Sequence, residues 1–194
     1  MNQNNIKFAE LKKYYYTTSS MFVIECSPSL EDSIMFTLVP SGSGDKKYNS
    51  AMAIKIKMST EEIGIIREAL LMFKGGGIVR FNDYAKQVMR GKYQENWISF
   101  YHQSPNYVTK IGINISSNGI PTLSVNRTTK KDNQQQSIWF PLTANIRPSV
   151  EILLMSYMQA VFNTSRIQQE QPVQQQPVQQ QPMQNQSYQP EPQY

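Results

Sequence analysis

The stretch Ala51–Phe73, AMAIKIKMSTEEIGIIREALLMF, changes its hydrophobic period within a few residues. From Ala51 to Met58 apolar and polar residues alternate, which is typical of a strand with one buried face. Ser59 can cap a helix whose first turn carries Glu61 and Glu62. Apolar residues then recur at helical spacing and three glycines follow, which predicts a strand leading directly into a helix: Ile63, Ile66, Leu70 and Phe73, then Gly75, Gly76 and Gly77.

The same order of elements occurs twice in the chain. The junction IKIKMSTEEIGIIREALL of the first half has a counterpart, IWFPLTANIRPSVEILLM, near Pro148. We interpret residues 10–75 and 96–165 as a structural pseudo-repeat. Ile78–Glu95 is an extra segment with a short helix around Asp83–Met89. The other predicted elements are strands at Met21–Cys26, Ile34–Val39, Trp97–His102, Tyr107–Ser116, Ile120–Arg127 and Ser137–Leu142, a hairpin turn at Asn118-Gly119, and a helix at Ser149–Phe162 opened by Pro148.

Composition changes sharply at the end of this pattern. Residues 1–167 form the predicted folded domain, and 168–194 are almost entirely Gln and Pro, which predicts a disordered tail. Lys and Arg exceed Asp and Glu by 19 − 14 = +5, and the tail holds only Glu170 and Glu191. The domain therefore carries 19 − 12 = +7, so the positive charge belongs to the domain.

Several functional classes are disfavoured by what the chain lacks. His102 is the single histidine and Cys26 the single cysteine, which excludes a zinc cluster or a disulfide framework within one chain. Glu31-Asp32 and Glu61-Glu62 fit a turn and a helix start better than an acid–base pair. We expect no enzyme, no catalytic residue, no cofactor and no metal. No apolar stretch fits a membrane span or a signal peptide, so we expect an intracellular protein, cytoplasmic or nucleoid-associated.

Basic and aromatic residues lie close together at several points in the predicted strands and loops. Single-stranded nucleic acid requires this combination, because cations neutralise phosphates and flat rings stack on unpaired bases. Alternate residues of a strand project onto one face, so a sheet can present both groups together. The predicted nucleic-acid-binding residues are Lys12, Lys13, Tyr14, Tyr15, Tyr16, Lys46, Lys47, Tyr48, Lys55, Lys57, Trp97, Phe100, Tyr101, Tyr107, Lys110, Arg127, Lys130, Lys131 and Trp139.

A structural interpretation competes with this one. Tyrosine and tryptophan also pack well within sheets, and lysine is common on strand edges. The alternative functions are RNA binding by the same fold, or a β-rich protein-interaction adaptor that uses the Gln/Pro tail as its contact. A hydrolase using clustered carboxylates is a third, weaker candidate.

The repeated order of four strands and a helix, with basic and aromatic strands, resembles the Whirly-type single-stranded-DNA-binding transcriptional regulators. Their superfamily includes a smaller transcriptional-coactivator domain, whose last strand and helix entry are similar to Ala53–Ile63. The Lys-Gly-Lys-Ala-Ala signature of plant Whirly proteins is absent from the sequence. The resemblance covers about residues 10–165 and implies an α+β fold of two antiparallel sheets packed on helices. It also implies a homo-oligomer, dimer or tetramer, whose outward strand faces bind single-stranded DNA during replication, repair or transcription.

Overall fold

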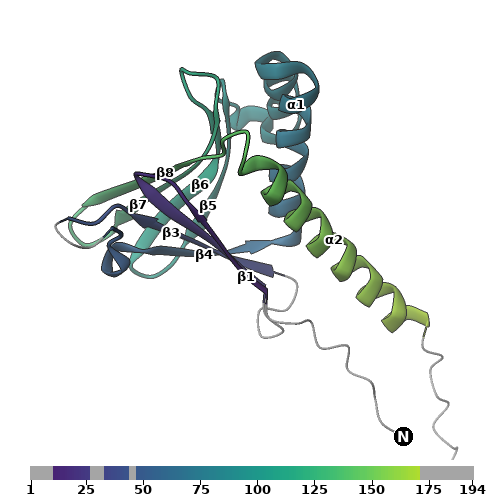
Figure 1. The fold of residues 1–194 in the computed structure, drawn as a ribbon, viewed down its shortest axis with the longest axis horizontal. Coiled ribbons are helices and arrows are strands. Elements are labelled where there is room, and N and C mark those ends of the chain that lie inside the picture. Colours follow the sequence, from purple (N-terminus) through teal and green to yellow (C-terminus); the bar gives the residue numbers. More distant parts are fainter. Residues whose placement is uncertain (1–10, 27–32, 44–46, 171–194) are drawn as a thin grey trace, which may run out of the picture.

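Two four-stranded antiparallel sheets, each followed by a helix, make up the chain in the computed structural model (Figure 1). The structure describes residues 11–26, 33–43 and 47–170, and the side chains of 12–26, 33–43 and 47–161. The first sheet contains β1 (Leu11–Tyr16), β2 (Ser20–Cys26), β3 (Ser33–Pro40) and β4 (Ile54–Ser59), and α1 spans Thr60–Met89. The second sheet contains β5 (Trp97–Gln103), β6 (Tyr107–Ile115), β7 (Pro121–Thr129) and β8 (Gln135–Pro141), and α2 spans Arg147–Glu170. Two short 3-10 turns are η2 (Ser50–Met52) and η3 (Arg90–Lys92).

Successive side chains of a strand point alternately to an inner face, which packs into the core, and to an outer face. On β4, Ile54, Ile56 and Met58 are buried, whereas Lys55 and Lys57 are exposed, as the sequence period predicts. Both helices lie on one side of the molecule, beside the two sheets (Figure 1). The inner faces meet each other and these helices, so each sheet leaves its opposite face toward solvent.

The helix α1 begins with the predicted cap. The Ser59 side chain accepts a hydrogen bond from the Glu62 backbone N–H at 3.3 Å, and the Glu62 carboxylate accepts one from the Ser59 backbone N–H at 2.9 Å. Such a capping box satisfies two backbone donors that a helix start would otherwise leave unpaired. It fixes the point at which the chain turns from β4 into the helix.

The three predicted terminating glycines do interrupt α1, but a second helical part follows them. Gly77 has φ +64° and ψ −151°, a conformation that only glycine adopts readily, and the helix kinks there. The second part is longer than the helix predicted around Asp83–Met89, because Phe81 and Ala85 form a buried stripe at helical spacing. Ile78–Met89 thus belongs to α1, whereas the sequence suggested a separate extra segment.

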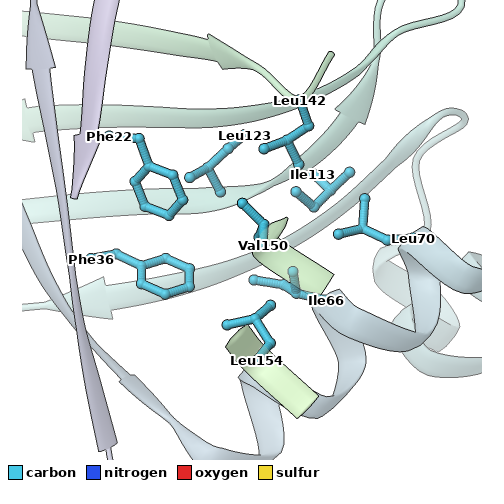
Figure 2. A pocket seen from close by; sticks show the side chains of 9 residues that line it. All are labelled: Phe22, Phe36, Ile66, Leu70, Ile113, Leu123, Leu142, Val150 and Leu154. Atoms are coloured by element: carbon cyan, nitrogen blue, oxygen red, sulfur yellow. The ribbon is translucent and has the colours of Figure 1, made fainter. Parts of the chain in front are cut away.

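One hydrophobic core includes residues of both sheets and of both helices α1 and α2. Phe22 of the first sheet and Phe140 of the second approach to 5.5 Å between ring centroids, and both are buried. A small cavity remains between the sheets and the helices, and Figure 2 shows that its lining side chains are all apolar. It therefore offers no hydrogen-bond partner to a polar ligand, and we regard it as a packing gap. Its lining residues are Phe22, Phe36, Ile66, Leu70, Ile113, Leu123, Leu142, Val150 and Leu154.

The predicted fold class, α+β with two β-β-β-β-α units, is confirmed. Gly119 takes φ +69° in the β6–β7 turn, as the Asn-Gly signal predicts. The predicted start of the strand at Ala51 is wrong, because Ser50–Met52 forms a 3-10 turn and β4 begins at Ile54. The helix α2 continues to Glu170, past the predicted domain end at Ile167, and the remaining tail, 171–194, lies outside the described residues. Neither described helix combines the length and apolarity that crossing a membrane requires.

Candidate nucleic-acid interface

Three tyrosine rings form a connected group on the outer face of the first sheet. Tyr14 and Tyr16 project from the same side of β1, and their rings are nearly parallel, 7° apart, at 6.3 Å between centroids. Tyr48 extends the group, with its ring 5.8 Å from that of Tyr16 and its hydroxyl donating to the Thr17 carbonyl at 2.8 Å. Tyr14 is 42 % exposed and Tyr16 53 %, so both rings are open to solvent.

Lysines surround these rings. The Lys12 ammonium lies 5.8 Å from the Tyr14 ring centroid, and that of Lys47 lies 5.4 Å from the Tyr48 ring. On the far edge of the same face, Lys55 and Lys57 are exposed. We call this outer surface the tyrosine–lysine face, which comprises Lys12, Tyr14, Tyr16, Lys47, Tyr48, Lys55 and Lys57.

One carboxylate partly offsets the charge of the tyrosine–lysine face. Glu25 lies across from Lys12 in the β1–β2 register, and the Lys12 Nζ to Glu25 carboxylate distance is 3.3 Å. Hydrogen bonding to Glu25 raises the pKa of the Lys12 ammonium, which stays protonated. Because Lys12 is already paired, Lys47, Lys55 and Lys57 are the better candidates for phosphate contacts.

The outer face of the second sheet also holds a cation between rings. The Lys110 ammonium lies 4.3 Å from the Trp97 ring centroid and 5.7 Å from that of Tyr101. Trp139 stands on the opposite edge strand, β8, and is 63 % exposed. Tyr101 is 58 % exposed.

Polar side chains fill the space between these aromatic groups. Tyr101, Lys110, Asn126 and Ser137 are cross-strand partners in one continuous row across β5, β6, β7 and β8. The Ser137 hydroxyl donates to Asn126 Oδ1 at 2.6 Å. We call the surface the tryptophan face, which comprises Trp97, Tyr101, Lys110, Asn126, Ser137 and Trp139.

Three of the predicted binding residues point away from these faces. Tyr15 is a core residue: it is buried, its ring lies 6.0 Å from Phe22, and its hydroxyl bonds to the Ser149 hydroxyl at 3.1 Å. Burial raises the pKa of Tyr15. Phe100 packs against the core from the inner side of β5. Lys13 is exposed but alternates with Lys12, so it lies on the side of β1 opposite to the tyrosine–lysine face.

Tyr107 and Arg127 form a separate contact where the two sheets meet. The Arg127 guanidinium lies 5.0 Å from the Tyr107 ring and donates to the Thr109 hydroxyl and to the Lys55 carbonyl, both at 3.1 Å. Burial lowers the pKa of Arg127 without removing its charge. The bond to Lys55 ties β7 to β4 and the bond to Thr109 ties it to β6, so Arg127 has a structural role.

The remaining predicted cations belong to loops. Lys130 and Lys131 lie in the exposed β7–β8 turn, where Lys130 Nζ donates to the Ser104 carbonyl at 2.7 Å. Lys46 lies outside the described residues. The structure thus brings most of the predicted residues together on two faces and one turn, whereas Tyr15, Phe100, Lys13, Tyr107 and Arg127 lie elsewhere.

Sequence reasoning missed Asn126, Ser137 and Gln94. Gln94 Oε1 accepts a hydrogen bond from Lys110 Nζ at 3.5 Å and so helps to position that cation. A search restricted to basic and aromatic residues excludes such neutral polar side chains. Alternation along the strands could have identified two of them. Asn126 and Ser137 are cross-strand partners in the row of Lys110, so they point to the same outer face.

Comparisons with known proteins identify the fold. No protein-family model matches the sequence, and no curated protein is similar to it in sequence. Among solved structures, the plant transcriptional regulator PBF-2 superposes with a TM-score of 0.58 at 13 % identity, covering 85 % of this chain and 90 % of that chain. WHY3 from Arabidopsis thaliana gives 0.56 at 12 % identity, covering 84 % of this chain and 94 % of that chain. WHY1 from the same plant superposes with a TM-score of 0.57 at 9 % identity, covering 84 % of this chain and 90 % of that chain. These are Whirly proteins, and the chain has their fold.

Proposed function

We propose that the protein binds single-stranded nucleic acid, DNA in preference to RNA, and protects or organises strands during replication, repair or transcription. The observation that carries the proposal is the pairing of an exposed ring with a lysine ammonium group on each outer face, Tyr14 with Lys12 and Tyr101 with Lys110. The likeness to a protein described as a plant transcriptional regulator supports a role in transcription. The role we propose is non-enzymatic and intracellular, in the cytoplasm or on the nucleoid.

Each chemical group has a distinct task in this proposal. Lys47, Lys55 and Lys57 neutralise phosphates and release counterions, which makes binding fall steeply with salt. Exposed rings of Tyr14, Tyr16 and Trp139 stack on bases, at about 1–3 kcal/mol per base. Unpaired bases are accessible to rings that are exposed on an open sheet, whereas the bases of a duplex are already stacked on one another. Duplex DNA should therefore bind more weakly than a single strand.

We also propose that the protein assembles into a dimer or tetramer through its helices. The apolar stripe predicted for α1 packs largely inside the protomer, with Ile63, Ile66 and Leu70 buried. Val150 and Leu154 of α2 are buried as well. Other apolar side chains on the helices are exposed and could form the contact. They are Ile78 and Val79 on α1, and Ile152 and Met155 on α2.

A titration of fluorescent oligonucleotides tests the function. We expect tight, salt-sensitive binding to single-stranded DNA, weaker binding to RNA, and little binding to duplex. The double variant Tyr14→Ala/Tyr16→Ala should weaken DNA binding by about tenfold or more, because two stacking surfaces are lost. Tyr15→Phe is the matched control: it loses the Ser149 hydrogen bond in the core and should leave binding unchanged.

Two outcomes would redirect the proposal. Tighter binding to RNA than to DNA would assign the same faces to RNA. Absence of binding to either strand at low salt would overturn nucleic-acid binding and favour a protein-interaction adaptor that uses its Gln/Pro tail.

A further inference from the structure

The two outer faces differ in what lies between their aromatic rings. In the first sheet, the row that begins at Tyr14 continues through Val23 and Thr37 to Lys55. In the second sheet, the corresponding row consists of Tyr101, Lys110, Asn126 and Ser137. The two central residues of the first row, Val23 and Thr37, carry methyl groups. The second row instead contains an ammonium group, an amide and a hydroxyl, from Lys110, Asn126 and Ser137.

The hydrogen bonds within the second row fix what it can offer to a ligand. Ser137 donates its proton to Asn126 Oδ1, which occupies the amide oxygen. Among the described residues, no acceptor is bonded to the Asn126 amide nitrogen, so this NH₂ group remains a donor. Lys110 carries an ammonium, which can only donate. Two neighbouring side chains in the row therefore both present donors.

A row of small side chains runs alongside the donor row. Ser99, Gly112 and Ser124 are cross-strand partners, and Trp139 ends their row on β8. A Cβ atom at Gly112 would lie 1.9 Å from the Ile98 carbonyl oxygen, so the close approach of β5 and β6 requires glycine there. The small side chains in this row therefore have a structural cause, and Lys110 and Asn126 beside them are half-buried.

Rings stand on both edge strands of this surface, Tyr101 on β5 and Trp139 on β8. Three strand spacings of about 4.8 Å separate these strands by roughly 14 Å. A base stacked on either ring would direct an edge toward the donor row between them.

We infer that the tryptophan face reads base edges and prefers bases that present a carbonyl oxygen to Lys110 and Asn126. This inference rests on the proposed binding of single strands. Guanine, thymine and uracil carry carbonyl oxygens where adenine and cytosine carry amino groups. An amino group facing two donors leaves hydrogen bonds unmade, so strands rich in adenine or cytosine bind less tightly. The tyrosine–lysine face contributes affinity without this selection.

Oligodeoxyuridine and oligodeoxycytidine form the test pair, because the two pyrimidines differ in the carbonyl or amino group at ring position 4 and in the proton on N3 that accompanies the carbonyl. Strands of about 16 nucleotides cover the upper range of single-strand site sizes. We expect the wild-type protein to bind the uridine strand about fivefold more tightly, the value of roughly one hydrogen bond. Asn126→Ala should reduce this ratio toward one.

The control variants separate this inference from the proposed function. Lys55→Ala/Lys57→Ala should weaken binding of both strands and keep their ratio, because these lysines contact phosphates. Thr37 occupies on β3 the position in its row that Asn126 occupies on β7. Thr37→Ala should change neither the affinity for the two strands nor the ratio of their affinities. Equal affinities for the two strands in the wild type, or a ratio unchanged by Asn126→Ala, would overturn base reading while binding itself stands. Failure of both strands to bind would instead overturn the proposed function.

Discussion

The tyrosine–lysine face and the tryptophan face occupy equivalent places in two sheets of the same topology, but their chemistry differs. The first face carries Lys12, Lys47, Lys55 and Lys57, with Glu25 as its acid. The second has Lys110 as the cation of its four-residue row and neutral polar groups beside it. Two sheets of the same topology thus carry one surface rich in lysine and another rich in neutral polar groups.

The inner faces show the opposite relation, because the central rows of both are apolar and meet in one core. Ile24, Phe36 and Ile56 occupy one row of the first sheet, and Phe100, Ile111, Val125 and Ile138 one row of the second. Alternation keeps the two sides of each strand independent. The outer residues can therefore differ between the sheets without cost to the packing that the sheets share.

Neighbouring residues on β8 provide the strongest test of this independence. Phe140 is fully buried beside Phe22, whereas Trp139 is 63 % exposed. Phe140→Ala should lower the free energy of unfolding by about 3–5 kcal/mol, through lost burial and the cavity left behind. Trp139→Ala should leave stability within about 1 kcal/mol, since little of its surface is buried, but should weaken DNA binding through lost stacking. Urea unfolding and a DNA titration of both variants measure the two effects.

The independence of the two sides would be contradicted if Trp139→Ala unfolded the protein as readily as Phe140→Ala. Residue 139 would then support the core in spite of its exposure. A second contradiction would be a Phe140→Ala variant that kept its stability but bound DNA more weakly than the wild type.

The number of cations on each face predicts a smaller, electrostatic difference. Lys55→Ala/Lys57→Ala should weaken single-strand binding roughly tenfold at moderate salt and lower the slope of log affinity against log salt by about 1.4, at about 0.7 per phosphate contact. Lys110→Ala should lower that slope by no more than about 0.7. Affinity measured across a series of salt concentrations gives both slopes. Equal slopes for the two variants would show that the faces share the phosphate contacts evenly.

The sequence predicted the fold well because each element has a local cause. The change of period at Met58–Ser59, the capping residues and the Asn-Gly turn all act over a few residues, and all three are present in the structure. The second part of α1 was underestimated, since its buried stripe consists of Phe81 and Ala85 among polar residues. Their burial depends on contacts with the rest of the fold, which local periodicity does not reveal.

The candidate site was less predictable, because composition does not tell which side of a strand a residue occupies. Tyr14, Tyr15 and Tyr16 are identical in the sequence pattern, yet the middle ring is in the core and the outer two are exposed. Alternation along β1 distinguishes the three tyrosines only once the strand itself is known. The sequence shows this segment to be basic and aromatic but does not delimit a strand there. Asn126 and Ser137 became visible as a pair only through the register of β7 and β8.

A contact between the two halves offers the smallest of the predicted effects, and its sign can be tested with pH. Glu62, at the start of the helix that follows the first sheet, lies 3.3 Å from Nε2 of His102 on β5 of the second. Burial by itself would raise the pKa of Glu62, but His102 and the Ser59 backbone N–H stabilise the carboxylate, and the net pKa lies below the ordinary value of 4.5. A lowered folded-state pKa contributes stability above the unfolded pKa, and this contribution is lost as pH falls through the folded value.

Glu62→Gln should therefore destabilise the protein by about 1 kcal/mol at neutral pH, as the loss of a capping interaction does. The difference from wild type should shrink as pH falls below the ordinary carboxyl pKa of 4.5, because the wild-type carboxyl then becomes protonated and resembles the amide. Urea unfolding at several pH values measures this convergence. Glu61→Gln is the matched control, because Glu61 is exposed on the same helical turn and its substitution should change stability little. A constant deficit for Glu62→Gln down to pH 3 would mean that its charge does not stabilise the junction that sets the two faces relative to each other.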